Sequence, residues 1–237
     1  MDEGLLQNRI NMKTIVIIPA FNEQAAIGEV VKKSLQYADD VLVVDDGSAD
    51  NTSEIAENAG ASLLKHPTNF GKGVSLRDAF GQVEGYDIVV TIDGDGQHNP
   101  DEIPDLIKPI KQDKADFVNG SRYLNGFDEN TPAYRRVGQT VLDIATNITA
   151  GTKVTDSQSG FRAFKGSTIS CYKFRDPGFG IESEMIADAA ENNLRILEVP
   201  ITVKYDVENS STKGPVTHGV GVLFKIAKDK LIRMTKR

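Results

Sequence analysis

The sequence predicts an α/β fold with a mainly parallel, Rossmann-like sheet flanked by helices, and three observations carry this prediction. Short apolar, β-branched runs alternate with helical segments through the first half of the chain, which is the pattern of βαβ units. The runs contain few polar residues, as do strands that are buried on both faces. Three of the first four runs end in acidic or polar loops, which a parallel sheet brings to one edge.

The first half is expected to hold four strands joined by right-handed crossovers. The expected elements, in order, are strand 14–18, a helix to about residue 37, strand 41–44, a helix capped by Asp50 or Asn51, strand 61–64, a glycine-rich turn at 69–73, helix 74–83 and strand 88–92.

The second half is expected to alternate less regularly. A helix after Pro100 should be interrupted or bent near Pro104 and Pro109, because proline lacks the N–H that a helix interior uses. The other expected elements are strand 115–119, a loop at 124–131, helix 132–150, a turn at 156–160 leading into a short strand, helix 181–192, strands 195–199 and 201–205, a polar loop at 206–217 and a last helix at 218–237.

The composition is that of a globular, soluble protein with one large domain or two small ones. Of 237 residues, 39% are hydrophobic and 26% charged, and the net charge of −7 argues against a nucleic-acid binder. The single cysteine, Cys171, excludes an internal disulfide framework and fits the reducing cytoplasm. No apolar run approaches the roughly 20 residues that span a bilayer.

The strongest candidate site follows the fourth strand. There the sequence Asp93-Gly94-Asp95-Gly96-Gln97 places two carboxylates one residue apart. Carboxylates this close repel each other unless a cation lies between them, and the oxygens of Asp93, Asp95 and Gln97 suit Mg²⁺ or Mn²⁺. Gly94 lacks a Cβ, which lets a bulky anion approach the backbone. The alternative is a solvated polar turn.

Several basic residues are candidates for neutralising phosphates. Lys72 lies between two glycines, although the spacing is not that of a Walker loop. Guanidinium groups match phosphate oxygens, and Lys213 lies in a polar loop that could close over a substrate. The arginine candidates are Arg122, Arg135 and Arg136. For each, a solvated surface position is the alternative.

Two acidic pairs have both functional and structural interpretations. Asp45 and Asp46 follow the second strand, where carboxylates commonly accept hydrogen bonds from ribose hydroxyls; helix capping is the alternative. Glu182 and Glu184 lie near a helix start, where the helix dipole alone favours acids. The dinucleotide-binding glycine fingerprint is missing after the first strand, which counts against NAD.

The last helix, 218–237, combines an apolar face with a basic one. Its basic residues are Lys225, Lys228, Lys230, Arg233, Lys236 and Arg237. A basic amphipathic helix in an acidic chain can lie on an anionic membrane, and the alternative is a helix docked on the core.

Six motifs in order resemble the family 2 glycosyltransferases of the GT-A fold. The general resemblance is carried by Val-Ile-Ile-Pro-Ala-Phe-Asn-Glu (16–23), Val-Asp-Asp-Gly-Ser (44–48) and Asp-Gly-Asp-Gly-Gln-His (93–98). The branch of dolichyl-phosphate mannose and glucose synthases is indicated by Gly-Ser-Arg-Tyr (120–123), Asp-x-x-Ser-Gly-Phe-Arg (156–162) and Glu-Val-Pro-Ile (198–201). The resemblance runs from about residue 13 to residue 213.

The resemblance implies an enzyme that moves a sugar, with inversion, from a UDP- or GDP-sugar to dolichyl or polyprenyl phosphate. It implies Mg²⁺ or Mn²⁺ as cofactor and a product that supplies protein glycosylation or cell-envelope glycans. A GT-A catalytic domain at 13–217 would lie between an N-terminal extension (1–12) and the basic helix. We expect a cytoplasmic protein in peripheral contact with the membrane, and the sequence leaves open whether it is a homo-oligomer.

The resemblance also implies roles for individual residues. Those implied for the nucleoside pocket are Pro19, Ala20, Glu23, Asp45 and Asp46. Those matching the family's metal-binding set are Asp93, Asp95 and Gln97. Those facing donor or acceptor phosphates are Arg122 and an arginine of the pair Arg135 and Arg136. Those on the acceptor side are Asp156, Ser159, Arg162 and Glu184.

One departure from the family pattern leaves the donor sugar open. The mannose synthases usually carry an arginine shortly before a Gly-x-Ser-Lys motif, and here Lys204-Tyr205 precedes Ser-Ser-Thr-Lys (210–213). The alternatives are a family 2 enzyme with a non-lipid acceptor, a sugar nucleotidyltransferase and a non-catalytic nucleotide-binding protein. The glycine- and arginine-rich loop of a nucleotidyltransferase is missing after the first strand.

Overall fold

The computed structural model describes residues 12–124, 133–178 and 180–204, with side chains in the helix 133–150 described from residue 139 onward. The predicted loop 206–217 and helix 218–237 lie outside these residues, as do residues 1–11 of the predicted extension. Within the described ranges, no helix is long and apolar enough to cross a membrane.

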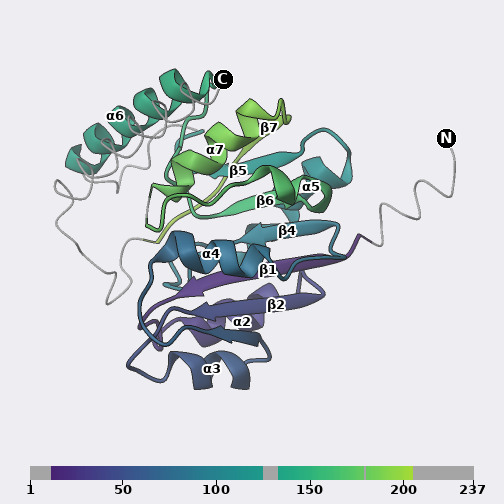
Figure 1. Cartoon of the computed structure of the whole chain (residues 1–237), viewed down its shortest axis with the longest axis vertical. Coiled ribbons are helices and arrows are strands. Elements are labelled where there is room, and N and C mark those ends of the chain that lie inside the picture. The colour runs from purple at the N-terminus through teal and green to yellow at the C-terminus, as the bar shows by residue number, and fades with distance from the viewer. Residues whose placement is uncertain (1–11, 125–132, 179, 205–237) are drawn as a thin grey trace, which may run out of the picture.

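Seven strands form one sheet in the order β3-β2-β1-β4-β6-β5-β7 (Figure 1). The strands are β1 (Thr14–Ala20), β2 (Asp40–Asp45), β3 (Ser62–Lys65), β4 (Ile88–Thr91), β5 (Phe117–Ser121), β6 (Arg162–Lys165) and β7 (Ile196–Pro200). All neighbours pair in parallel except β6, which is antiparallel to both β4 and β5. The predicted α/β fold with a mainly parallel sheet is confirmed.

Helices cover both faces of the sheet. They are α2 (Ile27–Ser34), α3 (Thr52–Asn58), α4 (Lys72–Phe80), α5 (Ile103–Lys111), α6 (Ala133–Ala150) and α7 (Ile181–Glu191), with short 3₁₀ turns at Pro100–Glu102 and Gly166–Cys171. One apolar core joins α2, α3 and α5 to the sheet, and a second joins α4 and α7 to the opposite face. The alternation of side chains along β1 explains both cores, because Val16 and Ile18 enter the first and Ile15 and Ile17 the second.

The structure differs from the expected elements at a few positions. The predicted interruption near Pro109 is not found, since helix α5 continues through this residue. Pro104 lies in the first turn of α5, where a backbone N–H makes no hydrogen bond within the helix and proline is therefore tolerated. Strand β5 begins two residues later than expected, at Phe117. Of the second predicted strand, 201–205, the described residues 201–204 form only an isolated bridge, between Val203 and His98.

Candidate functional site

The loops after β1, β2 and β4 meet at the carboxyl edge of the sheet, as a parallel arrangement requires. The pairing places Ala20 opposite Asp45, and β1 also pairs with β4 up to Thr91. The loop after β1 is bound to the loop after β2, since the N–H of Asn22 donates to Ser48 Oγ (2.9 Å) and the N–H of Ala49 donates to Asn22 Oδ1 (2.9 Å). Pro19 and Ala20 lie on this edge, half-buried and buried.

Three carboxylates, from Glu23, Asp93 and Asp95, gather at this edge. Burial, together with the charges of Asp95 and Asp93, raises the pKa of Glu23 to about 8. Burial and the charge of Asp93 raise the pKa of Asp95 to about 6. The backbone N–H of Gln97 donates to Asp95 Oδ1 at 3.0 Å. Burial is the larger cause of both shifts, and the negative charges of the neighbouring carboxylates add to it.

Lys72 supplies the fixed positive charge beside these acids. Its Nζ lies 2.5 Å from Asp93 Oδ1 and 2.8 Å from Glu182 Oε1, and the side chain is largely buried. Burial acts to lower the pKa of Lys72, but the charges of Asp93 and Glu182 outweigh it and hold this pKa above its ordinary value. The pKa of Asp93 is lowered in return, because Lys72 outweighs its burial.

The donor set fits a divalent cation. After Lys72 has compensated one charge, Asp95 and Glu23 still repel each other and Asp93, and a hard cation would relieve that repulsion. No group of three His, Cys, Asp or Glu side chains is preformed around a metal position in the described part of the chain. A cation held here would therefore complete its coordination shell with water, with phosphate or with an amide oxygen such as that of Gln97.

Gly94 and Gly96 shape the loop that carries these acids. A Cβ on Gly94 would lie 3.3 Å from both Ala20 Cβ and Ile27 Cδ1, so this glycine allows the loop to pack closely on β1 and α2. Gly96 adopts a φ of +73°, which favours glycine. Packing thus accounts for Gly94, and its expected contact with an anion stays a prediction.

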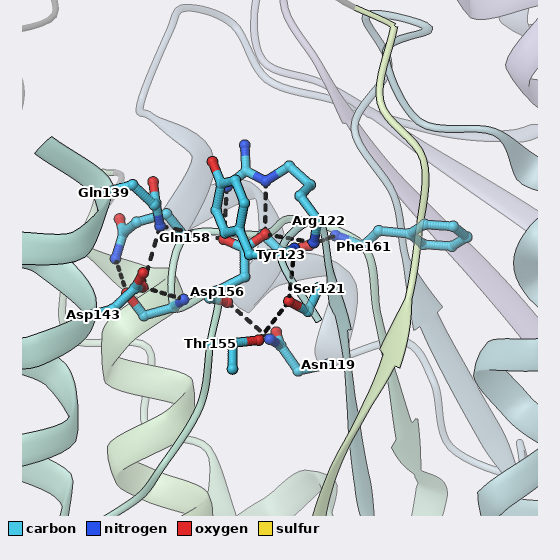
Figure 2. Close-up of polar contacts among 12 residues, drawn as sticks. Asn119, Ser121, Arg122, Tyr123, Gln139, Asp143, Thr155, Asp156, Gln158 and Phe161 are labelled. Carbon is cyan, nitrogen blue, oxygen red and sulfur yellow. Dashed lines mark hydrogen bonds and ion pairs between the residues drawn. The ribbon is translucent and has the colours of Figure 1, made fainter. Parts of the chain in front are cut away.

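Arg122 and Asp156 form a bidentate ion pair at the end of β5 (Figure 2). Arg122 Nε donates to Asp156 Oδ2 (2.6 Å) and Arg122 Nη2 donates to Oδ1 (2.7 Å). The backbone N–H of Arg122 adds a third bond, and Gln139 of α6 donates to Oδ1 at 3.2 Å. Burial acts to raise the pKa of Asp156, but Arg122 outweighs it and the pKa is lowered.

A polar network supports this pair from β5 and β7. Asn119 donates through Nδ2 to the backbone oxygen of Asp156 (2.8 Å) and to Glu198 Oε1 (3.0 Å). Glu198 accepts the N–H of Thr155 through its other oxygen (2.8 Å). In Figure 2, Asn119 and Thr155 lie below the ion pair. Asn119 belongs to β5, so its hydrogen bond to the backbone of Asp156 links the ion pair to the sheet. Asn119 was not among the predicted site residues, although an asparagine inside an apolar strand is a signal that could have indicated it.

Ser159 and Arg162 are buried inside the protein. Arg162 is 1% exposed, and its guanidinium donates to the backbone oxygens of Glu182 (2.7 Å) and Ser157 (2.9 Å). The hydroxyl of Ser159 accepts the N–H of Phe161 at 3.3 Å. Both residues therefore fix the segment between Asp156 and β6, and their predicted influence on an acceptor would act through that segment.

Asp45 and Asp46 are buried and hydrogen-bonded to loops. Asp45 accepts the N–H of Ser48 (2.8 Å) and the hydroxyl of Ser53. Asp46 lies 2.8 Å from His66 Nδ1 and accepts the backbone N–H groups of the turn before Lys72. Their predicted contact with a base or ribose stays a prediction.

Of the other predicted site residues, the structure describes the side chain of Glu184 but not those of Arg135, Arg136 and Lys213. Glu184 is buried and accepts backbone N–H groups from Arg175 and Asp176. The side chains of Arg135 and Arg136, in α6, and all of Lys213 lie outside the described residues. His98 was not among the predicted site residues, but its Nε2 lies 3.9 Å from Asp93 Oδ2. Burial lowers the pKa of His98 to about 4.

Comparison with known proteins identifies similar sequences and folds. Residues 15–172 match the model of glycosyl transferase family 2. A UDP-N-acetylglucosamine–dolichyl-phosphate N-acetylglucosaminyltransferase of Methanococcus voltae is 36% identical, over 89% of this chain and 92% of the relative. An undecaprenyl-phosphate mannosyltransferase of Micrococcus luteus is 31% identical, over 86% of this chain and 89% of the relative. Glucosyl-3-phosphoglycerate synthase of Mycobacterium tuberculosis, solved with Mg²⁺ and uridine diphosphate, has a similar fold, with a TM-score of 0.72 at 24% identity over 94% of this chain and 82% of that one.

Proposed function

The chain belongs to glycosyl transferase family 2, and from that premise we propose that it transfers a sugar from a nucleotide sugar to a polyprenyl phosphate with the help of a divalent cation. That it is a glycosyltransferase of the GT-A fold follows from the family and from the mainly parallel sheet. The acceptor, the cation and the roles of individual residues are the parts that we propose.

One observation carries the proposal for the site. Acids that repel one another, Glu23, Asp93 and Asp95, share one edge of the sheet with two oriented cations, Lys72 and Arg122. This arrangement matches what two phosphate-bearing substrates need: a place for a divalent cation and positive charge for the phosphates.

The donor would bind over β1, β2 and β4. Asp93, Asp95 and Gln97 would hold Mg²⁺ or Mn²⁺, which when bound acts as a Lewis acid that stabilises the leaving diphosphate. Lys72 would keep Asp93 in place and add positive charge near the same diphosphate. Pro19, Ala20 and Glu23 would border the nucleoside, with Asp45 and Asp46 behind them.

The acceptor phosphate would lie near Arg122. A phosphate monoester oxygen is ionised near neutral pH, so it can attack the anomeric carbon without a strong general base. Asp156 accepts hydrogen bonds at both carboxylate oxygens, from Arg122 and Gln139, which suits holding the guanidinium better than removing a proton. Arg122, oriented in this way, would offset the charge of two phosphates brought together.

The named relatives support a lipid acceptor. The relatives from Methanococcus voltae and Micrococcus luteus both carry a polyprenyl-type phosphate in their names, whereas the glucosyl-3-phosphoglycerate synthase is similar only in fold. The many basic residues in the sequence 218–237 would suit peripheral contact with the cytoplasmic face of a membrane.

The test is a transfer assay with short-chain polyprenyl phosphate and a panel of UDP- and GDP-sugars, with Mn²⁺, Mg²⁺ or a chelator. We expect one polyprenyl-phosphate sugar, formed only with a divalent cation and lost in Asp95→Ala. Donor hydrolysis without lipid product would retain glycosyl transfer and reject the lipid acceptor. Binding of nucleotide without any turnover would favour a binding protein.

A further inference from the structure

The turn that carries Lys72 is held by protein contacts on both sides. Before it, Asp46 accepts the backbone N–H of Phe70 (2.9 Å) and of Gly71 (2.7 Å). After it, the N–H of Gly73 donates to the carbonyl oxygen of Pro177 at 3.0 Å. The backbone of Lys72 is therefore fixed between the end of β2 and the loop 175–178.

The turn lies so close to the loop 175–178 that positions 71 and 73 have no space for a side chain. A Cβ on Gly73 would lie 2.9 Å from the carbonyl carbons of Asp176 and Pro177. Gly71, with a φ of +98°, packs against Pro177 in the same way. Because the two segments touch backbone to backbone, the position of the loop determines the position of the turn.

Glu184 holds that loop in place. Its Oε1 accepts the backbone N–H of Arg175 and its Oε2 that of Asp176, each at 2.8 Å. Arg175 Nη1 approaches Oε1 at 3.4 Å. Glu184 is only 5% exposed, so these charge-assisted bonds are shielded from water.

Helix α7 thus reaches Lys72 by two routes. Glu182, in its first turn, contacts Nζ directly at 2.8 Å. Glu184, two residues later, supports the loop that backs the turn. The first route fixes the ammonium of Lys72, and the second fixes its backbone.

We propose that Glu184 is a positioning residue that acts through Lys72, holding the loop 175–178 so that the ammonium lies against Asp93 in the donor site. This role replaces the acceptor-side role that the sequence resemblance implied. It rests on the proposed function, because Lys72 matters to the reaction only if a nucleotide sugar binds there.

The first experiment is a double-mutant cycle of Glu184→Gln, Lys72→Met and the double variant. The readout is the Kd of UDP and GDP with Mn²⁺, measured by calorimetry. Glutamine retains one acceptor oxygen and leaves one loop N–H without a partner, so Glu184→Gln is expected to weaken nucleotide binding about tenfold. With methionine at position 72 the same change is expected to alter Kd less than about twofold, because no ammonium is left to position.

Asp188→Asn is the matched control. Asp188 lies in the same helix, is 1% exposed and accepts the backbone N–H of Lys173 at 2.8 Å. It approaches the loop 175–178 through the side chain of Arg175, whose Nη1 lies 3.5 Å from Oδ1, whereas Glu184 binds the backbone N–H groups of that loop. This variant is expected to lower the melting temperature as Glu184→Gln does, yet to leave nucleotide affinity unchanged. Additive effects in the cycle, or an effect of Glu184→Gln on the acceptor KM alone, would overturn the proposal.

Hydrogen exchange of residues 70–76 without nucleotide gives a second readout. Glu184→Gln is expected to speed exchange of the Gly73 amide, whereas Asp188→Asn is not. Unchanged exchange in Glu184→Gln would also overturn the proposal. Wild-type protein that binds no nucleotide would contradict the proposed function, and the exchange data would still test the link between Glu184 and the turn.

Discussion

Arg122 and Asp156 face each other across the end of β5, with both carboxylate oxygens of Asp156 bound to the guanidinium at 2.6 and 2.7 Å. Asp156 has no exposed surface, and Arg122 remains half-buried at the sheet edge. A buried carboxylate therefore orients a guanidinium group whose side chain stays 20% exposed.

Asp156→Asn is expected to reduce both stability and turnover. Removing one partner of a buried ion pair typically costs about 3–5 kcal/mol, because the other charge is left uncompensated. The free energy of unfolding in urea should fall by an amount of this order, and kcat should fall because Arg122 is no longer oriented.

Asp116→Asn provides the comparison for that prediction. Asp116 also forms a bidentate pair, with Arg195, just before β5 begins, but there the side chains are 15% and 45% exposed, against 0% and 20% for Asp156 and Arg122. Exposed pairs contribute about 0–1 kcal/mol, so this variant should unfold almost as the wild type does and keep full activity. Equal destabilisation by the two substitutions would contradict the assigned difference in burial.

Asp95→Asn should separate function from stability. Asp95 repels Asp93 and Glu23, so its neutral replacement is expected to stabilise the protein against unfolding when a chelator is present. Activity should nevertheless fall about a thousandfold, because a divalent cation contributes several kcal/mol to the transition state. Full activity in this variant would exclude Asp95 as a ligand.

The fold and the position of the acids after β4 could be predicted from the sequence, because both depend on local patterns. Apolar β-branched runs identified the strands, and a strand followed directly by Asp93 and Asp95 delivers both to the sheet edge. The antiparallel direction of β6 was not predictable in this way. It depends on where the chain returns after α6, which no local pattern specifies.

The partners of the site residues could not be predicted either. Lys72 was expected to contact phosphate or base, and the structure places it between Asp93 and Glu182. Glu184 was expected near the acceptor, and it holds the backbone of Arg175 and Asp176. Such contacts join segments distant in sequence, so only the packing of α7 against the sheet brings them together.

The buried carboxyl group of Asp143 should make stability depend on pH. It accepts hydrogen bonds from the Ser157 N–H (2.7 Å) and Gln139 (3.2 Å), and burial, aided by the charge of Asp156, raises its pKa to about 6. Because the folded pKa exceeds the ordinary aspartate value of 3.8, the native state binds the proton more tightly than the unfolded chain does. This contribution to stability is present in full below about pH 4 and is lost as pH rises through about 6.

Asp143→Asn tests this dependence. The stability of the variant relative to wild type should rise between pH 4 and pH 7, by at most about 3 kcal/mol, because asparagine has no charge to bury. Urea unfolding at four pH values across that range measures the difference. A constant difference at all four would show that Asp143 titrates normally in the folded protein.

Gly160→Ala should disrupt the ion pair of Lys72 without touching either partner. A Cβ on Gly160 would lie 2.7 Å from Lys72 Nζ and 2.8 Å from Asp93 Cγ, so one of the two groups must move. Nucleotide affinity with Mn²⁺ is expected to fall about tenfold, the usual effect of losing a charged hydrogen bond. Gly81→Ala is the control, since its Cβ would meet only atoms at 3.4 Å or beyond and its φ is −69°. That substitution should leave affinity unchanged and stability equal or slightly higher, because alanine restricts the unfolded chain. If Gly160→Ala binds nucleotide as the wild type does, the contact between Lys72 and Asp93 has no part in donor binding.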